Sequence, residues 1–151
     1  MIIRNYTPDD FSAVINLLRL NTPKYFAPSE EKQFTRYLNF ELDHYYVAEE
    51  DGKVIACGGL NRSEEPSVIK ISWDIVHPDK HGKRIGSELT KFRLNKAREI
   101  NGIKTVCVRT SQHTNGFYEK MGFETKDIVK DYWSKGFDLY LMEMPLMKTE
   151  N

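Results

Sequence analysis

Apolar residues recur along this chain with two different periods. From Phe11 to Leu18, and again after Ser29, they are spaced three or four apart, which predicts two helices near the N-terminus. The first should begin at Pro8, where Thr7 can cap it, and end at Asn21. The first half of the chain therefore opens with a helical pair.

Short β-prone runs surround and follow these helices, at residues 2–6, 45–49, 54–60 and 68–76. Asp51-Gly52, a dipeptide typical of tight hairpin turns, separates the second run from the third. Pro78 ends the last run because proline cannot continue a hydrogen-bonded strand. The pattern predicts an antiparallel meander.

The pattern changes after Pro78. Residues 82–100 have helical spacing, Gly102 follows as a C-terminal cap, and residues 105–108 form a short apolar run. This order of strand, helix and strand predicts a parallel crossover. A short helix over residues 114–121 and strands near 123–129 and 137–144 complete the expected elements.

Composition narrows the class of protein. The 151 residues predict one domain, 1–151, and the 22 basic and 22 acidic side chains balance, which removes the electrostatic case for a nucleic-acid or membrane partner. Cys57 and Cys107 lie in apolar runs without metal-ligand spacing, so we expect core cysteines and no metal. We see no leader or membrane span, and we expect a cytoplasmic protein.

The segment from Ile75 to Ser87 carries the clearest chemical signal. A strand ends, a basic loop with two glycines follows, and a helix begins. The first amides of a helix have no internal partners and carry the positive end of its dipole, so the segment can bind a phosphate. Its spacing matches neither the Walker phosphate loop nor the dinucleotide fingerprint.

A second motif lies downstream, Phe117-Tyr118-Glu119-Lys120-Met121-Gly122-Phe123. Together with the order of elements and with His81-Gly82-Lys83-Arg84-Ile85-Gly86, it resembles the GNAT superfamily of acyl-CoA-dependent N-acyltransferases. The resemblance covers nearly the whole chain. It implies an α/β fold with a mixed, mostly antiparallel sheet of six to seven strands, splayed at the centre, and about four helices on both faces.

The first motif departs from the family signature, which is Gln or Arg, two residues, Gly, one residue, and Gly or Ala. His81 replaces the Gln or Arg, Arg84 replaces the first Gly, and Gly86 matches. Arg84 can still donate its backbone amide if its backbone is ordinary helix. Upstream of the second motif, Ser111 stands where many members have Asn and Thr114 where many have Ala.

The resemblance implies acetyl-CoA as co-substrate. The pantetheine arm would pair with the backbone of Ile75 and Val76, as an added strand does. The pyrophosphate would rest on the amides of residues 83–87. The full set of predicted coenzyme-binding residues is Ile75, Val76, His81, Gly82, Lys83, Arg84, Ile85, Gly86, Ser87, Ser111, Phe117 and Tyr118.

The resemblance also implies catalytic roles. Tyr118 would be the general acid that protonates the departing thiolate, and the Val76 amide would polarise the thioester carbonyl. For the base, strand alternation puts Ser72, Asp74 and Val76 on one face, so Asp74 is the first candidate. Glu49 on the neighbouring strand is the second, and water is the third.

The expected reaction is acetyl transfer to a primary amine of a small molecule, peptide or protein. The loops expected near the acceptor are residues 21–28, 61–67 and 131–136, and the aromatic residues there either line a pocket or pack ordinarily: Tyr25, Phe26, Tyr132, Trp133 and Phe137. A homodimer could form through residues 137–146. Two alternatives stay open: a non-catalytic acyl-CoA-binding sensor domain of the same fold, and an unrelated phosphate-binding module.

Overall fold

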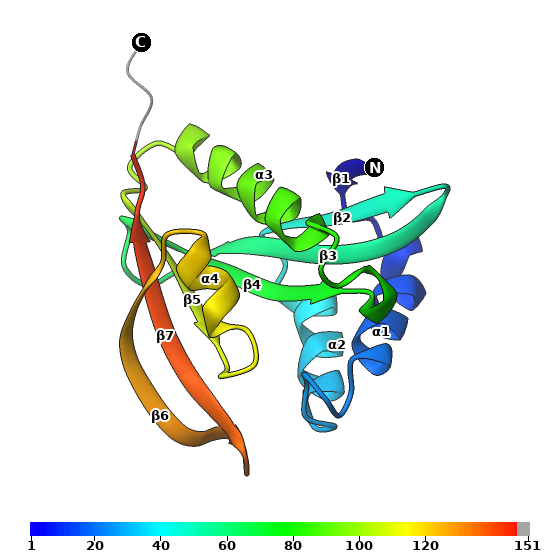
Figure 1. The fold of residues 1–151 in the computed structure, drawn as a ribbon. Helices are drawn as coiled ribbons and strands as arrows, with labels where there is room; N and C mark the ends of the chain where they lie inside the picture. The colour runs from blue at the N-terminus through cyan, green and yellow to red at the C-terminus, as the bar shows by residue number, and fades with distance from the viewer. Residues whose placement is uncertain (148–151) are drawn as a thin grey trace. The chain divides into compact units, whose positions relative to one another are not determined.

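The computed structural model describes residues 1–147 and has an α/β architecture (Figure 1). The elements, in chain order, are β1 (Ile2–Asn5), the 3-10 turn η1 (Pro8–Asp10), α1 (Phe11–Leu20), α2 (Glu30–Phe40), β2 (His44–Glu50), β3 (Lys53–Arg62), β4 (Val68–Val76), the 3-10 turn η2 (Pro78–Lys80), α3 (Ile85–Glu99), β5 (Thr105–Thr110), α4 (Asn115–Lys120), β6 (Glu124–Ser134) and β7 (Phe137–Pro145). The hydrogen-bonded strand order is β1-β2-β3-β4-β5-β7-β6. This confirms the predicted mixed sheet, the meander and the order of the helices.

Three predicted boundaries are wrong. The first helix was expected to begin at Pro8, but Pro8–Asp10 form the 3-10 turn η1 and α1 begins at Phe11. The third long helix begins at Ile85 rather than Gly82, because Gly82 and Arg84 both have positive φ angles, which a right-handed helix excludes. The predicted loop over residues 131–136 is strand as far as Ser134, and only Lys135 and Gly136 form the turn. The hairpin of β6 and β7 is therefore longer than its sequence pattern predicted.

The chain divides into two compact units. The N-terminal unit comprises Met1–Leu60 and Trp73–Phe92, and the C-terminal unit comprises Asn61–Ser72 and the chain from Arg93 onward.

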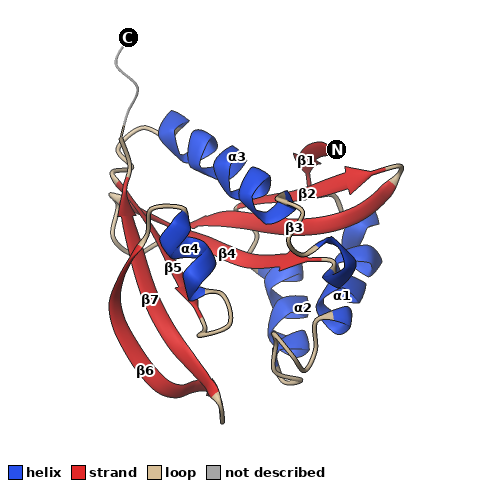
Figure 2. Cartoon of the chain, viewed as in Figure 1, coloured by secondary structure: helices blue, strands red, loops and turns tan. Residues whose placement is uncertain are grey.

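The N-terminal unit has a core on both faces of its strands. Tyr45 and Val47 of β2 pack with α1 and α2, whereas Tyr46 and Ala48 pack with Ile85 and Leu89 of α3. Successive side chains of a strand point to opposite faces, so the uninterrupted apolar run in β2 is that of a strand covered on both sides. Figure 2 shows α1 and α2 below β2 and β3 and the start of α3 above them.

The C-terminal unit is built around β7, which pairs with β5 on one side and β6 on the other. The first residues of β4 pair with β5 in a parallel ladder, from Val68 opposite Thr105 to Ile71 opposite Val108. Since both edges of β7 are already paired, an interface over residues 137–146 could not form by edge pairing of this strand. Along residues 1–147, every helix is too short or too polar to cross a membrane.

Candidate functional site

The loop between β4 and α3, residues 77–84, is built mainly from its own backbone bonds. The His77 amide donates to Ile55 of β3 at 2.8 Å, the Lys80 amide donates to His77 at 2.8 Å, and His77 Nδ1 accepts from the Asp79 amide at 3.1 Å. Pro78 supplies the fixed φ angle that starts η2. The loop is thus a compact turn that connects the end of β4 to the first residue of α3.

The last residue of this loop overturns one expectation. Arg84 has a φ angle of +64°, in the left-handed region, rather than ordinary helical backbone. An L-residue there brings its Cβ too close to the neighbouring carbonyl, which glycine avoids. This is a physical reason for the family's preference for glycine at the position that Arg84 occupies.

The amides at the start of α3 form the anion-binding feature of the site. The first helical bond runs from the Glu88 amide to the Arg84 carbonyl at 3.0 Å, so the amides of residues 85–87 precede it and have no carbonyl one turn back within the helix. The Lys83 amide, by contrast, donates to the Lys80 carbonyl at 3.3 Å. We predicted that the Lys83 amide would bind the pyrophosphate. In the structure that amide is already bonded inside the loop.

Basic side chains flank these amides. Lys83 and Arg84 are exposed, whereas the Lys80 ammonium is paired with Glu50 at 2.9 Å. The Lys80 hydrogen bond lowers the pKa of Glu50 and keeps that carboxylate ionised. Lys83 and Arg84 are therefore the basic side chains, not paired with Glu50, that the loop presents to solvent, and Asp79 is its exposed acidic side chain.

The end of β4 is held from outside its own strand. Asn21 Nδ2 donates to the Val76 carbonyl at 3.0 Å, and His81 Nε2 contacts the same oxygen at 2.9 Å. A carbonyl oxygen accepts only, so His81 Nε2 carries the proton of that bond. Two donors use both lone pairs of the oxygen, so only the N–H group of Val76 is left to bond acetyl-CoA.

A local break in β4 lies three residues earlier. Trp73 has a φ angle of +47°, and its carbonyl accepts a 2.8 Å hydrogen bond from the Tyr45 hydroxyl. Trp73 and Ile75 nevertheless pack with α1 and α2 while Val76 packs towards α3, as strand alternation predicts. The break changes the course of the strand immediately before Asp74.

Asp74, the first candidate for the base, lies beside buried aromatic residues. Its Oδ1 atom is shielded from solvent. Burial, then the neighbouring Cys57 and Tyr37, and then Asp74 raise the pKa of the Tyr45 hydroxyl well above its usual value. The carboxylate therefore lies close enough to Tyr45 for its charge to act on that hydroxyl.

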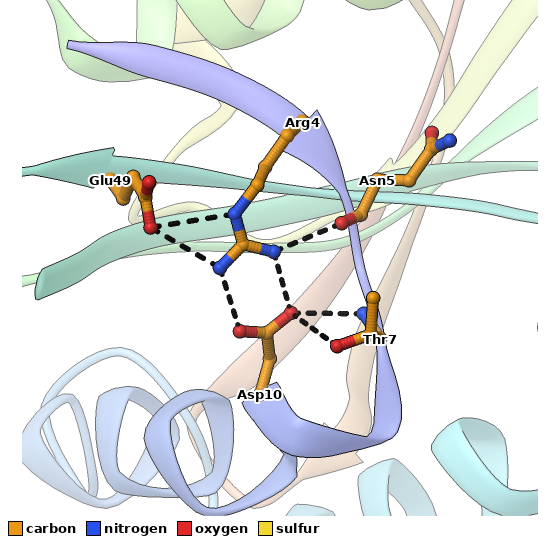
Figure 3. Close-up of polar contacts among 5 residues, drawn as sticks. All are labelled: Arg4, Asn5, Thr7, Asp10 and Glu49. Atoms are coloured by element: carbon orange, nitrogen blue, oxygen red, sulfur yellow. Dashed lines mark hydrogen bonds and ion pairs between the residues drawn. The ribbon is translucent and has the colours of Figure 1, made fainter. Parts of the chain in front are cut away.

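Glu49, the second candidate, is engaged in an ion pair (Figure 3). Arg4 donates to Glu49 Oε2 through Nε at 3.4 Å and through a terminal nitrogen at 3.3 Å, and it binds both oxygens of Asp10 at 2.8 and 2.9 Å. Asp10 also accepts from the Thr7 amide at 2.9 Å. The Glu49 carboxylate is thus already engaged by Arg4, so Glu49 remains the weaker prediction.

The remaining predicted residues belong to the C-terminal unit. Ser111 is buried, and its Oγ accepts from the His113 amide at 3.2 Å while its carbonyl accepts from the amides that open α4. Tyr118 on α4 is also buried, with its ring edge-on to Phe117 at 5.0 Å and to Phe123 at 5.5 Å. Its packing role is clear, and its role as an acid stays a prediction.

The aromatic residues named from the sequence have ordered partners. In the N-terminal unit, Tyr25 packs edge-on against His81 at 5.1 Å and Phe26 stacks on Trp73 at 6.4 Å. In the C-terminal unit, Arg109 lies over Tyr132 and Trp133. Phe137 packs against His113 at 5.4 Å. Within residues 1–147, no three His, Cys, Asp or Glu side chains are grouped as a metal site.

Sequence reasoning missed the roles of two residues that shape this site, Asn21 and Tyr45. Asn21 was predicted as the end of a helix and the start of a loop near the acceptor, and Tyr45 only as a strand residue. Both act on the backbone of β4 through bonds that span 55 and 28 positions in the sequence. No local pattern signals such contacts.

Comparison with known proteins agrees with this architecture. The family profile described as "Acetyltransferase (GNAT) domain" matches residues 41–125, more than half of the chain. An amino-acid acetyltransferase of Actinobacillus pleuropneumoniae serotype 3 (strain JL03) is 30% identical over 137 residues, which cover 85% of this chain and 29% of that protein. This chain thus spans about three tenths of the length of that relative.

Solved structures share the fold at low identity. An aminoglycoside 6'-N-acetyltransferase complexed with coenzyme A superposes with a TM-score of 0.80 at 15% identity and covers 100% of both chains. The ribosomal-protein-S18-alanine N-acetyltransferase from Escherichia coli gives a TM-score of 0.80 at 18% identity and covers 99% of this chain and 97% of its own. The profile match, together with this shared fold, shows that the chain belongs to the GNAT acetyltransferase family.

Proposed function

We propose that this protein is an N-acetyltransferase that moves the acetyl group of acetyl-CoA directly to a primary amine of a small molecule, peptide or protein. The observation that carries the proposal is the start of α3, where the first helical bond runs from the Glu88 amide to the Arg84 carbonyl, beside exposed Lys83 and Arg84 and soon after a strand whose final peptide is fixed. That arrangement suits a pyrophosphate group. Since the chain belongs to the GNAT acetyltransferase family, we infer that this group is the pyrophosphate of acetyl-CoA.

The proposed coenzyme set keeps the predicted residues with two changes of role. The pyrophosphate would take the amides of Ile85, Gly86 and Ser87, while Lys83, whose amide is used inside the loop, and Arg84, whose backbone is left-handed, would contribute the charge of their side chains. His81 and Gly82 would shape the loop, and Ile75 and Val76 would lie along the pantetheine. Ser111, Phe117 and Tyr118 complete the set.

The proposed reaction is one displacement through a tetrahedral intermediate. The amine nitrogen attacks the thioester carbonyl carbon, the N–C bond forms, and the C–S bond breaks. Asp74 or water removes the proton from the nitrogen, and Tyr118 donates its phenolic proton to the departing thiolate. The Val76 amide would stabilise the oxyanion. Glu49 is retained only as the alternative base.

Matched variants test these roles. Tyr118→Phe should lower kcat for acetyl transfer about 100-fold, whereas Tyr140→Phe, a tyrosine of the same unit, should leave it unchanged. Asp74→Asn should lower kcat comparably, with exposed Asp79→Asn as its control. Thiol release from acetyl-CoA measures all four, and equal rates in Tyr118→Phe and wild type would remove Tyr118 from the mechanism.

A non-catalytic acyl-CoA sensor remains the second candidate, because the left-handed Arg84 departs from the family signature where the coenzyme would bind. A sensor would bind acetyl-CoA without releasing CoA in the presence of any amine of a broad panel. The relatives bear the names of amino-acid, aminoglycoside and ribosomal-protein acetyltransferases, so the panel should include all three acceptor classes.

We also propose a cytoplasmic location, because Cys57 and Cys107 form no disulfide, which suits a reducing compartment such as the cytoplasm. A possible homodimer and a single domain over residues 1–151 remain predictions.

A further inference from the structure

Asn21 is a buried amide with both of its N–H groups in use. Its side chain ends α1 by donating to the Leu17 carbonyl at 2.8 Å and reaches β4 by donating to the Val76 carbonyl at 3.0 Å. The residue is 3% exposed, so solvent cannot replace either bond. Both partners are carbonyls, which fixes the orientation of the amide.

The peptide between Val76 and His77 is consequently fixed at both ends. Its N–H group, on His77, donates to Ile55 of β3 at 2.8 Å. A trans peptide points its C=O and N–H in opposite directions, so the Val76 carbonyl points away from β3, where Asn21 and His81 meet it. In an extended strand the N–H and C=O of one residue point to the same side, so the Val76 amide also points away from β3.

The backbone of Asn21 organises the loop that follows α1. Its carbonyl accepts from the Tyr25 amide at 2.9 Å and from the Phe26 amide at 3.2 Å. The Tyr25 ring then packs on His81, which is the second donor to the Val76 carbonyl. One residue thus joins the α1–α2 loop to the peptide that ends β4.

We propose that Asn21 is a positioning residue for acetyl transfer: it holds the Val76 peptide so that the Val76 amide can polarise the thioester carbonyl. The inference rests on the proposed function. In this proposal Asn21 acts through the Val76 peptide, because both N–H groups of its side chain are used by the Leu17 and Val76 carbonyls. A donor aimed at a developing oxyanion is effective only in a narrow geometry, so a small rotation of this peptide should affect turnover more than coenzyme affinity.

Two variants and one control test the proposal. Asn21→Asp keeps the shape of the side chain but places a carboxylate oxygen against two carbonyls, and Asn21→Ala removes both bonds. Thr22→Val is the matched control, since Thr22 Oγ1 donates to the Leu18 carbonyl at 2.8 Å and so ends the same helix without that second bond to β4. Each protein is compared at a temperature where circular dichroism shows it folded.

Three readouts separate positioning from general damage. We expect kcat to fall at least about tenfold in both Asn21 variants while the Kd of CoA, which has no thioester carbonyl, changes less than about threefold. In wild type the infrared carbonyl band of bound acetyl-CoA, labelled with carbon-13 at the carbonyl, should shift to lower frequency, and the variants should lose most of this shift. Thr22→Val should match wild type in all three.

The proposal is overturned if kcat falls no more than in Thr22→Val, if kcat and CoA affinity fall together, or if the carbonyl band is unchanged. If neither Asn21 variant folds, His81→Ala decides, because it removes the other donor from an exposed loop: a smaller band shift supports the proposal and an unchanged one overturns it. Failure of wild type to bind or turn over acetyl-CoA would instead reject the proposed function.

Discussion

The Tyr45 hydroxyl donates a 2.8 Å hydrogen bond to the carbonyl of Trp73, the residue at which β4 adopts a left-handed backbone. Tyr45 is buried among Tyr6, Phe34 and Tyr37. Its hydroxyl therefore stabilises a conformation that a tryptophan rarely adopts. The packed aromatic cluster fixes the course of the strand that leads to Asp74.

Tyr45→Phe should destabilise the left-handed backbone conformation at Trp73. The ring packing remains while the Trp73 carbonyl loses its donor, so we expect the free energy of unfolding to fall by about 1 to 2 kcal/mol and kcat to fall with it. Tyr6→Phe is the control, because Tyr6 packs edge-on against Tyr45 in the same cluster. Urea unfolding and thiol release measure the two effects, and equal behaviour of the two variants would contradict the assigned role.

Arg84→Gly should make the protein more stable. Glycine adopts the +64° φ angle without a Cβ clash, and the gain, less the greater freedom of glycine in the unfolded chain, should be about 0.5 to 1 kcal/mol. Lys83→Gly is the matched control, since Lys83 is not among the residues with positive φ. That variant should lose stability in the same urea titration. A loss in both variants would show that the Arg84 backbone is not strained.

Asp10→Asn should destabilise the protein in a pH-dependent way. The hydrogen bond from Arg4 lowers the pKa of Asp10 in the folded state, so its stabilisation is full above the unfolded pKa of about 4 and is lost as pH falls through the folded pKa. We expect a loss of about 2 kcal/mol at pH 7 and a progressively smaller difference as the pH falls below the unfolded pKa. The control is Asp9→Asn, in the same turn and exposed, which should change stability by less than about 0.5 kcal/mol. A pH-independent loss would contradict the ion-pair account.

Glu30→Gln should show the opposite dependence on pH. Burial raises the pKa of Glu30, and its Oε2 accepts from the Ala27 amide at 2.7 Å. Folding thus disfavours the ionised carboxylate, and stability falls as pH rises through the unfolded and then the folded pKa. Since glutamine keeps an acceptor for Ala27 without the charge, the variant should be more stable than wild type at pH 7 and lose that advantage below pH 4. Unfolding curves at both pH values test this.

Local sequence patterns predicted most of the fold because each helix, strand or turn depends mainly on consecutive residues. The Asp51-Gly52 turn and the β4 run that ends before Pro78 lie where expected, and Gly102 has a positive φ angle just beyond the end of α3. The start of α3 was misplaced because positive φ at Arg84 has no signature in a residue that normally favours helix. The end of β6 was misplaced because residues 131–134 have no alternating pattern.

The candidate site was predictable only in the segments that contain a sequence motif. The phosphate-binding loop could be predicted from its glycines and from its place between a strand and a helix. The two hydrogen bonds to the Val76 carbonyl could not be predicted, because Asn21 and His81 reach it through tertiary contacts. The pairing of Glu49 with Arg4 was equally hidden, since it depends on the register of Ile2 opposite Glu49 between β1 and β2.

Thermal unfolding with saturating acetyl-CoA is the most direct test of the coenzyme site, with ATP and NAD as competing ligands. At about 100 times the dissociation constant, binding adds roughly 2.7 kcal/mol, which should raise the Tm by roughly 5 to 10 °C. Gly86→Glu should abolish the shift by placing a carboxylate among the helix-start amides, whereas Asn95→Glu, with the same charge farther along α3, should keep it. We predict a shift with acetyl-CoA and CoA alone; no shift, or one with ATP instead, would contradict the account.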